Sequence, residues 1–366
     1  MMKNFYPVIL AGGRGTRFWP LSRRRRAKQV LALDGKRTMI QHTVARLKPL
    51  AAEKSFWVIT NDDLNEVIAA QLPRISLQQI ISEPIGRNTA PAIGLAAFIL
   101  ARLDPDAVIG MFPSDHVIAD EGKFQKIIGQ AAELAAQGEN IVVLGIHPSR
   151  PETGYGYIEA GEKLSGGLLR VKRFTEKPNA ERAQEFLEAG NYFWNSGMFV
   201  WSAQTLAKAL REHLSETAPY LEEIAAAFGT RAFEKTFARL YPKCENISVD
   251  YAVLEPRSAK GEHASNLYCI PSSFGWNDLG SWAALYEHHA EKDHNSRNVI
   301  HGIASFALDA EGNFVHAPKK FVAAVGVKNL IVVETDDALL ITTRENSQDV
   351  AKIVKHLDEK KLEKLL

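Results

Sequence analysis

The chain has 366 residues, of which 46% are hydrophobic and 24% are charged, and its formal net charge is +1. An ordinary domain takes about 150 residues, so we expect one large core with a smaller second unit. The balanced charge argues against bulk attraction to nucleic acid or anionic lipid, and any anion-binding site must therefore be local.

The chain shows no sign of a targeting segment or a disulfide framework. MMKNFYPVIL at the N-terminus lacks the long apolar stretch of a signal peptide, and the longest apolar runs are too short to cross a membrane. Cys244 and Cys269 are not spaced as CxxC, which favours buried, inert thiols. We expect a cytoplasmic protein with neither nucleic acid nor membrane as a partner.

The first half alternates apolar strand-like runs with helical patterns. Strands are expected at 8–11, 56–60, 79–82, 107–112 and 141–145. Helices are expected at 39–50, 62–72, 89–103 and 124–137. This alternation predicts an α/β fold, a doubly wound and mostly parallel sheet with helices on both faces.

The second half predicts an extension of this sheet and a separate C-terminal unit. Helices are expected at 180–188 and 203–227 among short β-rich pieces. From about residue 298, short strands recur every eight to ten residues, which predicts a small β-helix or a barrel-like stack. An amphipathic helix within 349–366 must cover this chain or a second copy. The expected domains are 1–290 and 298–366.

A glycine-rich segment, LAGGRGTRFWP, follows the first expected strand. Gly12, Gly13 and Gly15 would let backbone amides approach a ligand at the edge where open α/β sheets bind ligands. The GxGxxG dinucleotide pattern fails because Phe18 replaces its third glycine, and no P-loop pattern is present. Hydride transfer and P-loop hydrolysis are therefore disfavoured.

Basic side chains around this segment indicate a phosphate ligand. Arg14, Arg17 and Lys28 supply enough charge to hold a triphosphate whose leaving part is pyrophosphate, and Thr16 lies among them. A glycine turn with solvated arginines is the alternative. The basic run at 23–26 fits a solvated face better.

These stretches resemble a known enzyme family. LAGGRGTRFWPLSR followed by AKQVLAL is similar to the nucleotide-binding loop of sugar-1-phosphate nucleotidyltransferases, and FWPLS resembles the mannose-1-phosphate guanylyltransferases among them. EPIGRNTAPAIGLAA, FPSDHVI, PETGYGYIE, FTEKP, NSGMFVW and FGWNDLGSW extend the similarity in the family's order over about 270 residues. Ala27 departs from the usual proline, which implies a more flexible loop.

The resemblance implies a glycosyltransferase-A-like nucleotidyltransferase core at 1–290. It also implies a reaction in which α-D-mannose 1-phosphate and GTP give GDP-mannose and pyrophosphate. Two unit charges about 4 Å apart repel by roughly 4 kcal/mol at an effective dielectric near 20, so a bridging cation matters more than an acid or a base.

Two aspartates are the candidate magnesium ligands. Asp115 follows the strand expected at 107–112 and so lies near the glycine loop, and Asp278 in WNDLG could reach the same edge. The resemblance assigns both to Mg²⁺. Spacing alone leaves open that Asp115 caps a turn and that Asp278 caps a helix starting near Leu279. His116 is expected to pack or to support the site.

Two further groups of residues are candidates for the base and the sugar. The guanine candidates are Glu83, Arg87, Asn88 and Thr89, although Asn88 or Thr89 could simply cap a helix. The sugar candidates are Lys177 for the phosphate, Glu176 and Asn195 for hydroxyls, and backbone amides at Gly154 and Gly156, which could also be plain turn glycines. Glu176 and Lys177 face the same way only if the strand ends near Pro178.

The leading hypothesis is a Mg²⁺-dependent guanylyltransferase in which Arg17, Lys28 and Lys177 are catalytic. A uridylyl- or thymidylyltransferase acting on glucose 1-phosphate is one alternative, and a non-catalytic sugar-nucleotide-binding subunit is another. Some family members carry a further isomerase domain, and because this chain ends at Leu366 we expect a single activity. The terminal helix and the β unit are the expected surfaces of a homodimer.

Overall fold

In the computed structural model, which describes residues 1–292 and 297–366, nine strands form the main sheet in the order β3-β2-β1-β4-β9-β6-β10-β8-β7. The strands are β1 (Phe5–Leu10), β2 (Trp57–Asn61), β3 (Ile80–Glu83), β4 (Val108–Pro113), β6 (Ile141–Ile146), β7 (Tyr157–Lys163), β8 (Leu169–Thr175), β9 (Tyr192–Ser202) and β10 (Leu267–Ser272). Neighbours from β3 to β4 pair in parallel, whereas β9 runs antiparallel between β4 and β6. The predicted α/β fold is confirmed.

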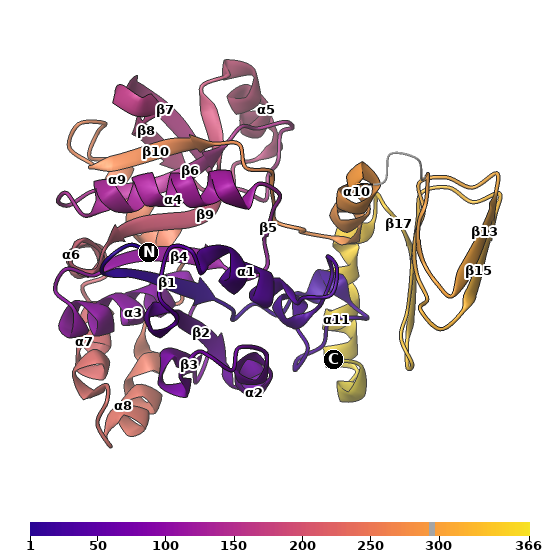
Figure 1. The fold of residues 1–366 in the computed structure, drawn as a ribbon, viewed down its shortest axis with the longest axis horizontal. Helices are drawn as coiled ribbons and strands as arrows, with labels where there is room; N and C mark the ends of the chain where they lie inside the picture. The colour runs from indigo at the N-terminus through magenta and orange to yellow at the C-terminus, as the bar shows by residue number, and fades with distance from the viewer. Residues whose placement is uncertain (293–296) are drawn as a thin grey trace.

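Helices cover both faces of this sheet (Figure 1). They are α1 (Met39–Leu47), α2 (Asp62–Gln71), α3 (Thr89–Leu103), α4 (Glu121–Ala135), α5 (Ala180–Ala189), α6 (Ala203–His213), α7 (Ala218–Ala227), α8 (Phe233–Leu240) and α9 (Glu255–Ser258). Successive side chains of a strand point to opposite faces, so Val8 joins the core around α3 while Ile9 joins the core around α4.

One predicted helix is wrong. The apolar spacing at 203–227 predicted a single helix, but α6 stops at His213 and α7 begins at Ala218. Pro219 lies in the first turn of α7, where its missing amide hydrogen costs nothing. In a continuous helix the same proline would remove a hydrogen bond and clash with the carbonyl four residues earlier.

The C-terminal β unit coils as the β-helix alternative predicted. Parallel pairing joins β12 (Val299–His301), β14 (Phe314–His316) and β16 (Leu330–Glu334), and β17 (Leu339–Thr343) closes this sheet antiparallel. A second parallel pair is formed by β13 (Ala304–Leu308) and β15 (Phe321–Val325). Figure 1 shows this unit projecting to one side of the main body. The expected domain boundary at 290–298 includes residues 293–296, which lie outside the described residues.

The terminal helix packs on the large body of its own chain. Helix α11 spans Val350–Glu359, shorter than the expected 349–366, and Val350 and Leu357 are buried with Phe18 of the glycine-rich segment. Phe18, Trp282 and Phe314 pack in series as tilted rings, with ring centroids 5.0 and 5.4 Å apart. The apolar face of α11 is thus used within this chain. No helix in the described ranges is long and apolar enough to cross a membrane.

Candidate active site

A short two-stranded ladder brings the two candidate metal ligands to one rim of the sheet. Strand β5 (Val117–Ile118) pairs antiparallel with β11 (Trp276–Asn277), and Val117 lies opposite Asn277. Continuing this register by one residue sets Asp278 opposite His116, directly beside Asp115. The ladder explains how residues from distant parts of the sequence meet.

The glycine-rich loop after β1 is held by its carbonyl groups. Gln29 Nε2 donates to the carbonyls of Ala11 and Gly13 at 2.7 and 2.8 Å, and Asn61 Nδ2 donates to that of Gly12 at 3.0 Å. Within residues 1–292 and 297–366, the amides of Gly13 and the two residues after it find no acceptor. Anchored carbonyls with unused amides beside them are typical of backbone segments that bind anions.

Gly15 lets this loop pass over Lys28. Its φ is +59°, and a Cβ added there would lie 2.6 Å from Lys28 Cβ, so no larger residue fits without a shift of the backbone. Ser22 Oγ donates to the Gly15 carbonyl at 2.7 Å and holds the turn from the other side. The loop and Lys28 are therefore packed as one unit.

Lys28 is the cation at the centre of the rim. Its side chain is buried, and its Nζ lies 2.9 Å from Asp115 Oδ2 and 2.5 Å from the Asp278 carbonyl oxygen. Burial alone would raise the pKa of Asp115, but the charge of Lys28 and its hydrogen bond to the carboxylate outweigh burial, and the pKa is lowered. Asp115 is therefore an ionised carboxylate at neutral pH.

The Asp278 carboxylate is held by a tyrosine that the sequence analysis did not single out. Tyr155 OH donates to Asp278 Oδ1 at 2.7 Å, and burial and the Asp278 charge raise the pKa of Tyr155 so that it stays a donor. The helix-capping alternative is wrong, because α10 (Trp282–Lys292) begins four residues later and the Leu279 amide donates to Asn277 Oδ1. The carboxylate is left available at the rim.

His116 packs beside this rim. Its ring packs edge-on against Trp276, and Trp276 Nε1 donates to His116 Nδ1 at 3.1 Å. Burial lowers the pKa of His116. A neutral imidazole that accepts from an indole fits the packing and supporting role expected of this residue.

Two carboxylates at one rim suit a magnesium ion. Mg²⁺ commonly takes one or two protein carboxylates and completes its octahedron with substrate phosphate oxygens and water. Within the described residues there is no cluster of three or more His, Cys, Asp or Glu side chains placed to hold a metal. The donor set of Asp115 and Asp278 therefore fits Mg²⁺ shared with a substrate better than a closed structural site.

Beside this rim lies a cavity of about 310 Å³. Its polar lining includes Thr89, His116, Tyr155, Glu176, Lys177, Asn195, Asp250 and Asp278. Strand β8 ends at Thr175 and Lys177 has a φ of +43°, so strict alternation is broken and both Glu176 and Lys177 reach the cavity. Lys177 Nζ lies 3.0 Å from Glu176 Oε1.

The two glycines of TGYGY differ in their surroundings. The Gly154 amide donates to Glu152 Oε1 at 3.0 Å, so it serves its own turn, as the turn alternative predicted. Gly156 packs against Glu176, since an added Cβ would lie 2.5 Å from Glu176 Oε2. That oxygen is buried and has no hydrogen-bond partner among the described residues.

The four guanine candidates gather near the start of α3, and each already has a protein partner. Glu83 Oε1 accepts from Tyr241 OH at 2.6 Å, and burial raises the pKa of Glu83 to about 7. The Arg87 guanidinium donates to the Pro242 carbonyl. Asn88 caps α3, which confirms the capping expectation, and Thr89 Oγ1 accepts from the Val249 amide at 2.9 Å. Glu83 lies against Gly12, beneath the loop.

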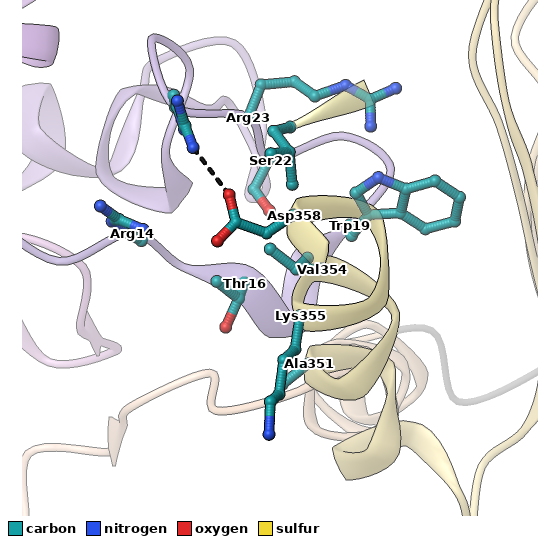
Figure 2. A pocket seen from close by; sticks show the side chains of 11 residues that line it. Arg14, Thr16, Trp19, Ser22, Arg23, Ala351, Val354, Lys355 and Asp358 are labelled. Carbon is teal, nitrogen blue, oxygen red and sulfur yellow. Dashed lines mark hydrogen bonds and ion pairs between the residues drawn. The ribbon is translucent and has the colours of Figure 1, made fainter. Parts of the chain in front are cut away.

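The C-terminal part of the chain reaches the same loop. Arg17 Nη1 donates to Gln348 Oε1 at 3.0 Å, just before α11. Figure 2 shows Arg14 and Thr16 across from Asp358 of α11, and these residues line a cavity of about 210 Å³. No local pattern around Gln348 indicated its contact with Arg17. Tyr155, by contrast, lies in the GYGY segment that had already been identified from the sequence.

The chain is similar to known proteins along nearly its whole length. The family described as "Nucleotidyl transferase" matches residues 6–295, and that described as "MannoseP isomerase/GMP-like beta-helix domain" matches residues 305–357. A mannose-1-phosphate guanylyltransferase of Salmonella typhimurium is 41% identical over 362 residues, which cover 97% of this chain and 72% of the relative. Another from Escherichia coli K12 is 39% identical over 363 residues, which cover 97% and 73%.

Solved structures agree with this assignment. A crystal structure from Thermus thermophilus, described as a mannose-1-phosphate geranyltransferase, is 31% identical with a TM-score of 0.84 and covers 97% of this chain and 100% of its own. A UDP-glucose pyrophosphorylase at 14% identity and a TM-score of 0.52 shares the fold. The chain belongs to the nucleotidyl transferase family and is a sugar-phosphate nucleotidyltransferase.

Proposed function

We propose that the protein joins mannose 1-phosphate and GTP to give GDP-mannose and pyrophosphate. The observation that carries this proposal is the meeting of Lys28, Asp115 and Asp278 between unused loop amides and a polar cavity. An anion-binding loop and a separate hydroxyl-binding cavity suit two phosphorylated substrates. The identity of the sugar and of the base is supported by relatives named for this reaction at about 40% identity.

The reaction exchanges one phosphoanhydride for another. An oxygen of the sugar phosphate attacks the α-phosphorus of GTP and forms a new P–O bond, while the bond from that phosphorus to the pyrophosphate oxygen breaks. The attacking oxygen is already ionised at neutral pH, so the site requires no general base. Positioning and charge neutralisation are the main contributions of the protein, and we expect a readily reversible reaction.

The proposed roles follow from where each side chain lies. The amides of residues 12–16, with Arg14 and Arg17, hold the triphosphate and then the departing pyrophosphate. Lys28 keeps Asp115 ionised and reduces repulsion at the rim. Lys177 orients the sugar phosphate, and Glu176 and Asn195 bind ring hydroxyls. Glu83, Arg87, Asn88 and Thr89 form the wall for guanine.

Asp115 and Asp278 would hold Mg²⁺, whose charge reduces the repulsion between the two phosphate groups when it is bound. Lys28 positions Asp115 by an ion pair, and Tyr155 positions Asp278 by a hydrogen bond. These partners keep both carboxylates turned toward the rim.

A substrate panel tests this function. Pyrophosphate release would be measured with GTP, UTP, dTTP and ATP against mannose 1-phosphate and glucose 1-phosphate, with and without Mg²⁺. GTP with mannose 1-phosphate and Mg²⁺ should give the highest rate. A preference for UTP or dTTP with glucose 1-phosphate would replace the proposed substrates, and nucleotide binding without any turnover would indicate a non-catalytic binding subunit.

We also propose a homodimer formed through the β unit. The apolar face of α11 is used within the chain, whereas Phe306 on β13 and Phe321 on β15 are 54% and 63% exposed. Exposed aromatic side chains on one pair of strands are typical of an interface. Light scattering should give a dimer for the natural chain and a monomer for the double variant Phe306→Ser/Phe321→Ser; a monomer for both excludes this interface.

A further inference from the structure

Asp250 is a carboxylate of the cavity of about 310 Å³ beside the Asp115–Asp278 rim. Neither the sequence motifs nor the proposed metal site assigns it a role. It opens a short π-helical segment, Asp250–Leu254, and lines the same cavity as Glu176 and Asn195. The backbone before it is tied to the start of α3, because the Val249 amide donates to Thr89 Oγ1 at 2.9 Å. The position of Asp250 is therefore set by two elements of the core.

Asn195 fixes the direction of the Asp250 side chain. Its Nδ2 donates to Asp250 Oδ1 at 2.9 Å, and its own Oδ1 accepts from the Gly197 amide at 3.0 Å. The Gly197 contact determines which way the Asn195 amide is turned. Among residues 1–292 and 297–366 no other side chain donates to Asp250, and its own backbone amide is the one further donor to the carboxylate, which therefore keeps acceptor capacity for a ligand.

The cavity holds more carboxyl groups than cations. Glu176 and Asp250 face it together with one ammonium, that of Lys177, which pairs with Glu176. Burial, followed by the charge of Glu176, raises the pKa of Asp250 to about 7. Polar groups gathered without enough protein partners are stabilised once a ligand supplies hydroxyl groups, which both donate and accept hydrogen bonds.

Resting on the proposed function, we propose that Asp250 hydrogen-bonds a ring hydroxyl of the hexose 1-phosphate and helps to determine which hexose the enzyme accepts. The partnerless Glu176 Oε2 and the free side of Asp250 then receive two hydroxyls of one sugar ring. Hexoses differ in the configuration of single hydroxyls. A site built around paired polar groups rejects a sugar that leaves one of them unpaired.

The test compares Asp250→Ala and Asp250→Asn with the natural chain. Asp106→Ala, which removes an exposed carboxylate, is the matched control. For Asp250→Ala the KM for mannose 1-phosphate should rise by about tenfold or more, because one hydrogen bond to a charged group is lost, and the KM for GTP should stay within about twofold. The ratio of kcat/KM for mannose 1-phosphate over glucose 1-phosphate should fall as well.

Asp250→Asn keeps the shape of the side chain and one acceptor oxygen, and it should recover part of the sugar KM, which a purely structural role would not produce. An unchanged sugar KM in Asp250→Ala, or an equal rise for both substrates, would overturn the inference. If Asp250→Ala does not fold, the test rests on Asp250→Asn. A variant whose sugar KM, GTP KM and mannose-to-glucose ratio of kcat/KM all equal those of the natural chain would then show that Asp250 does not bind the sugar. Absence of turnover in the natural chain would count against the proposed function instead.

Discussion

Arg17 Nη1 donates to Gln348 Oε1 at 3.0 Å although 331 positions separate the two residues in the chain. Arg17 belongs to the glycine-rich loop, and Gln348 lies immediately before α11. The contact ties the C-terminal part of the chain to the proposed pyrophosphate-binding group. The segment that follows the β unit therefore contacts the candidate active site.

Gln348→Ala should weaken the binding of GTP without changing the sugar site. Arg17 would lose the partner that limits its rotation, and we expect the KM for GTP to rise by about threefold to tenfold, the effect of one modest hydrogen bond. Steady-state kinetics with each substrate varied in turn measures this. Gln78→Ala, at an exposed site on the large body, is the control. An unchanged GTP KM would show that Arg17 is positioned without Gln348.

Asp115→Asn should abolish turnover far more than it weakens nucleotide binding. The amide keeps the shape of the carboxylate but removes the charge that pairs with Lys28 and that would hold Mg²⁺. We expect kcat to fall by about a hundredfold or more, with the Kd for GTP within roughly fivefold. Pyrophosphate release and calorimetric binding give the two values. A comparable loss in both would remove Asp115 from the catalytic role.

Glu83 predicts a pH dependence of stability. Its pKa in the folded protein, about 7, lies above the ordinary value of 4.5 because the carboxyl is buried. Between these values the folded chain keeps a proton that the unfolded chain has released, so stability is lost as the pH rises from about 4.5 to about 7. Glu83→Gln stays neutral, and its Tm relative to the natural chain should rise by roughly 2–5 °C between pH 5 and pH 8.

Thermal melting of both proteins across this range measures the Glu83 effect. Glu53→Gln is the control, because hydrogen bonds from Lys48 and Arg74 lower the pKa of this exposed carboxyl below its ordinary value of 4.5, so its Tm difference from the natural chain should stay constant between pH 5 and pH 8. A constant Tm difference between Glu83→Gln and the natural chain would show that Glu83 is ionised in the folded protein at pH 5.

Gly15→Ala should disrupt the loop through two separable effects. The residue has a φ of +59°, which costs a non-glycine residue about 1 kcal/mol, and the new Cβ would collide with Lys28. Gly166→Ala is the matched control, since its φ is +70° and a Cβ there meets nothing within 4 Å.

We expect Gly15→Ala to lower the Tm clearly more than Gly166→Ala and to reduce turnover by about tenfold or more as Lys28 is displaced. Equal melting temperatures with normal turnover for both variants would mean that the loop accommodates the side chain.

Several features of the fold and of the site were accessible from local patterns. Apolar spacing placed β1, β4 and α3 and predicted the recurring short strands of the β unit, because each is defined by residues close together in the chain. The break between α6 and α7 was missed because the periodicity continues through it while Pro219 interrupts the hydrogen bonding. Gly15 was identified by type, but its contact with Lys28 was not.

Some residues of the candidate site could likewise be predicted from local patterns, and others could not. Residues inside dense motifs, such as Lys28, Asp115 and Asp278, could be named from their neighbours and from the resemblance they carry. Tyr155 and Asp250 became visible as site residues through contacts with Asp278 and Asn195, which lie far away along the chain. Such contacts depend on strand order and register, and no local pattern encodes them.

Local order along the chain was enough to predict an α/β sheet, to place a glycine-rich loop at its edge and to single out two carboxylates near that loop. It left open where α11 would pack, which residues hold Asp278, and how Glu176 and Lys177 could face one cavity. Those outcomes arose when the β5–β11 ladder, the left-handed turn at Lys177 and the shared core around Phe18 formed. Burial and hydrogen bonding act between neighbours in space. Contacts between segments that are distant in the sequence, such as the β5–β11 ladder and the core around Phe18, therefore form only when the chain folds.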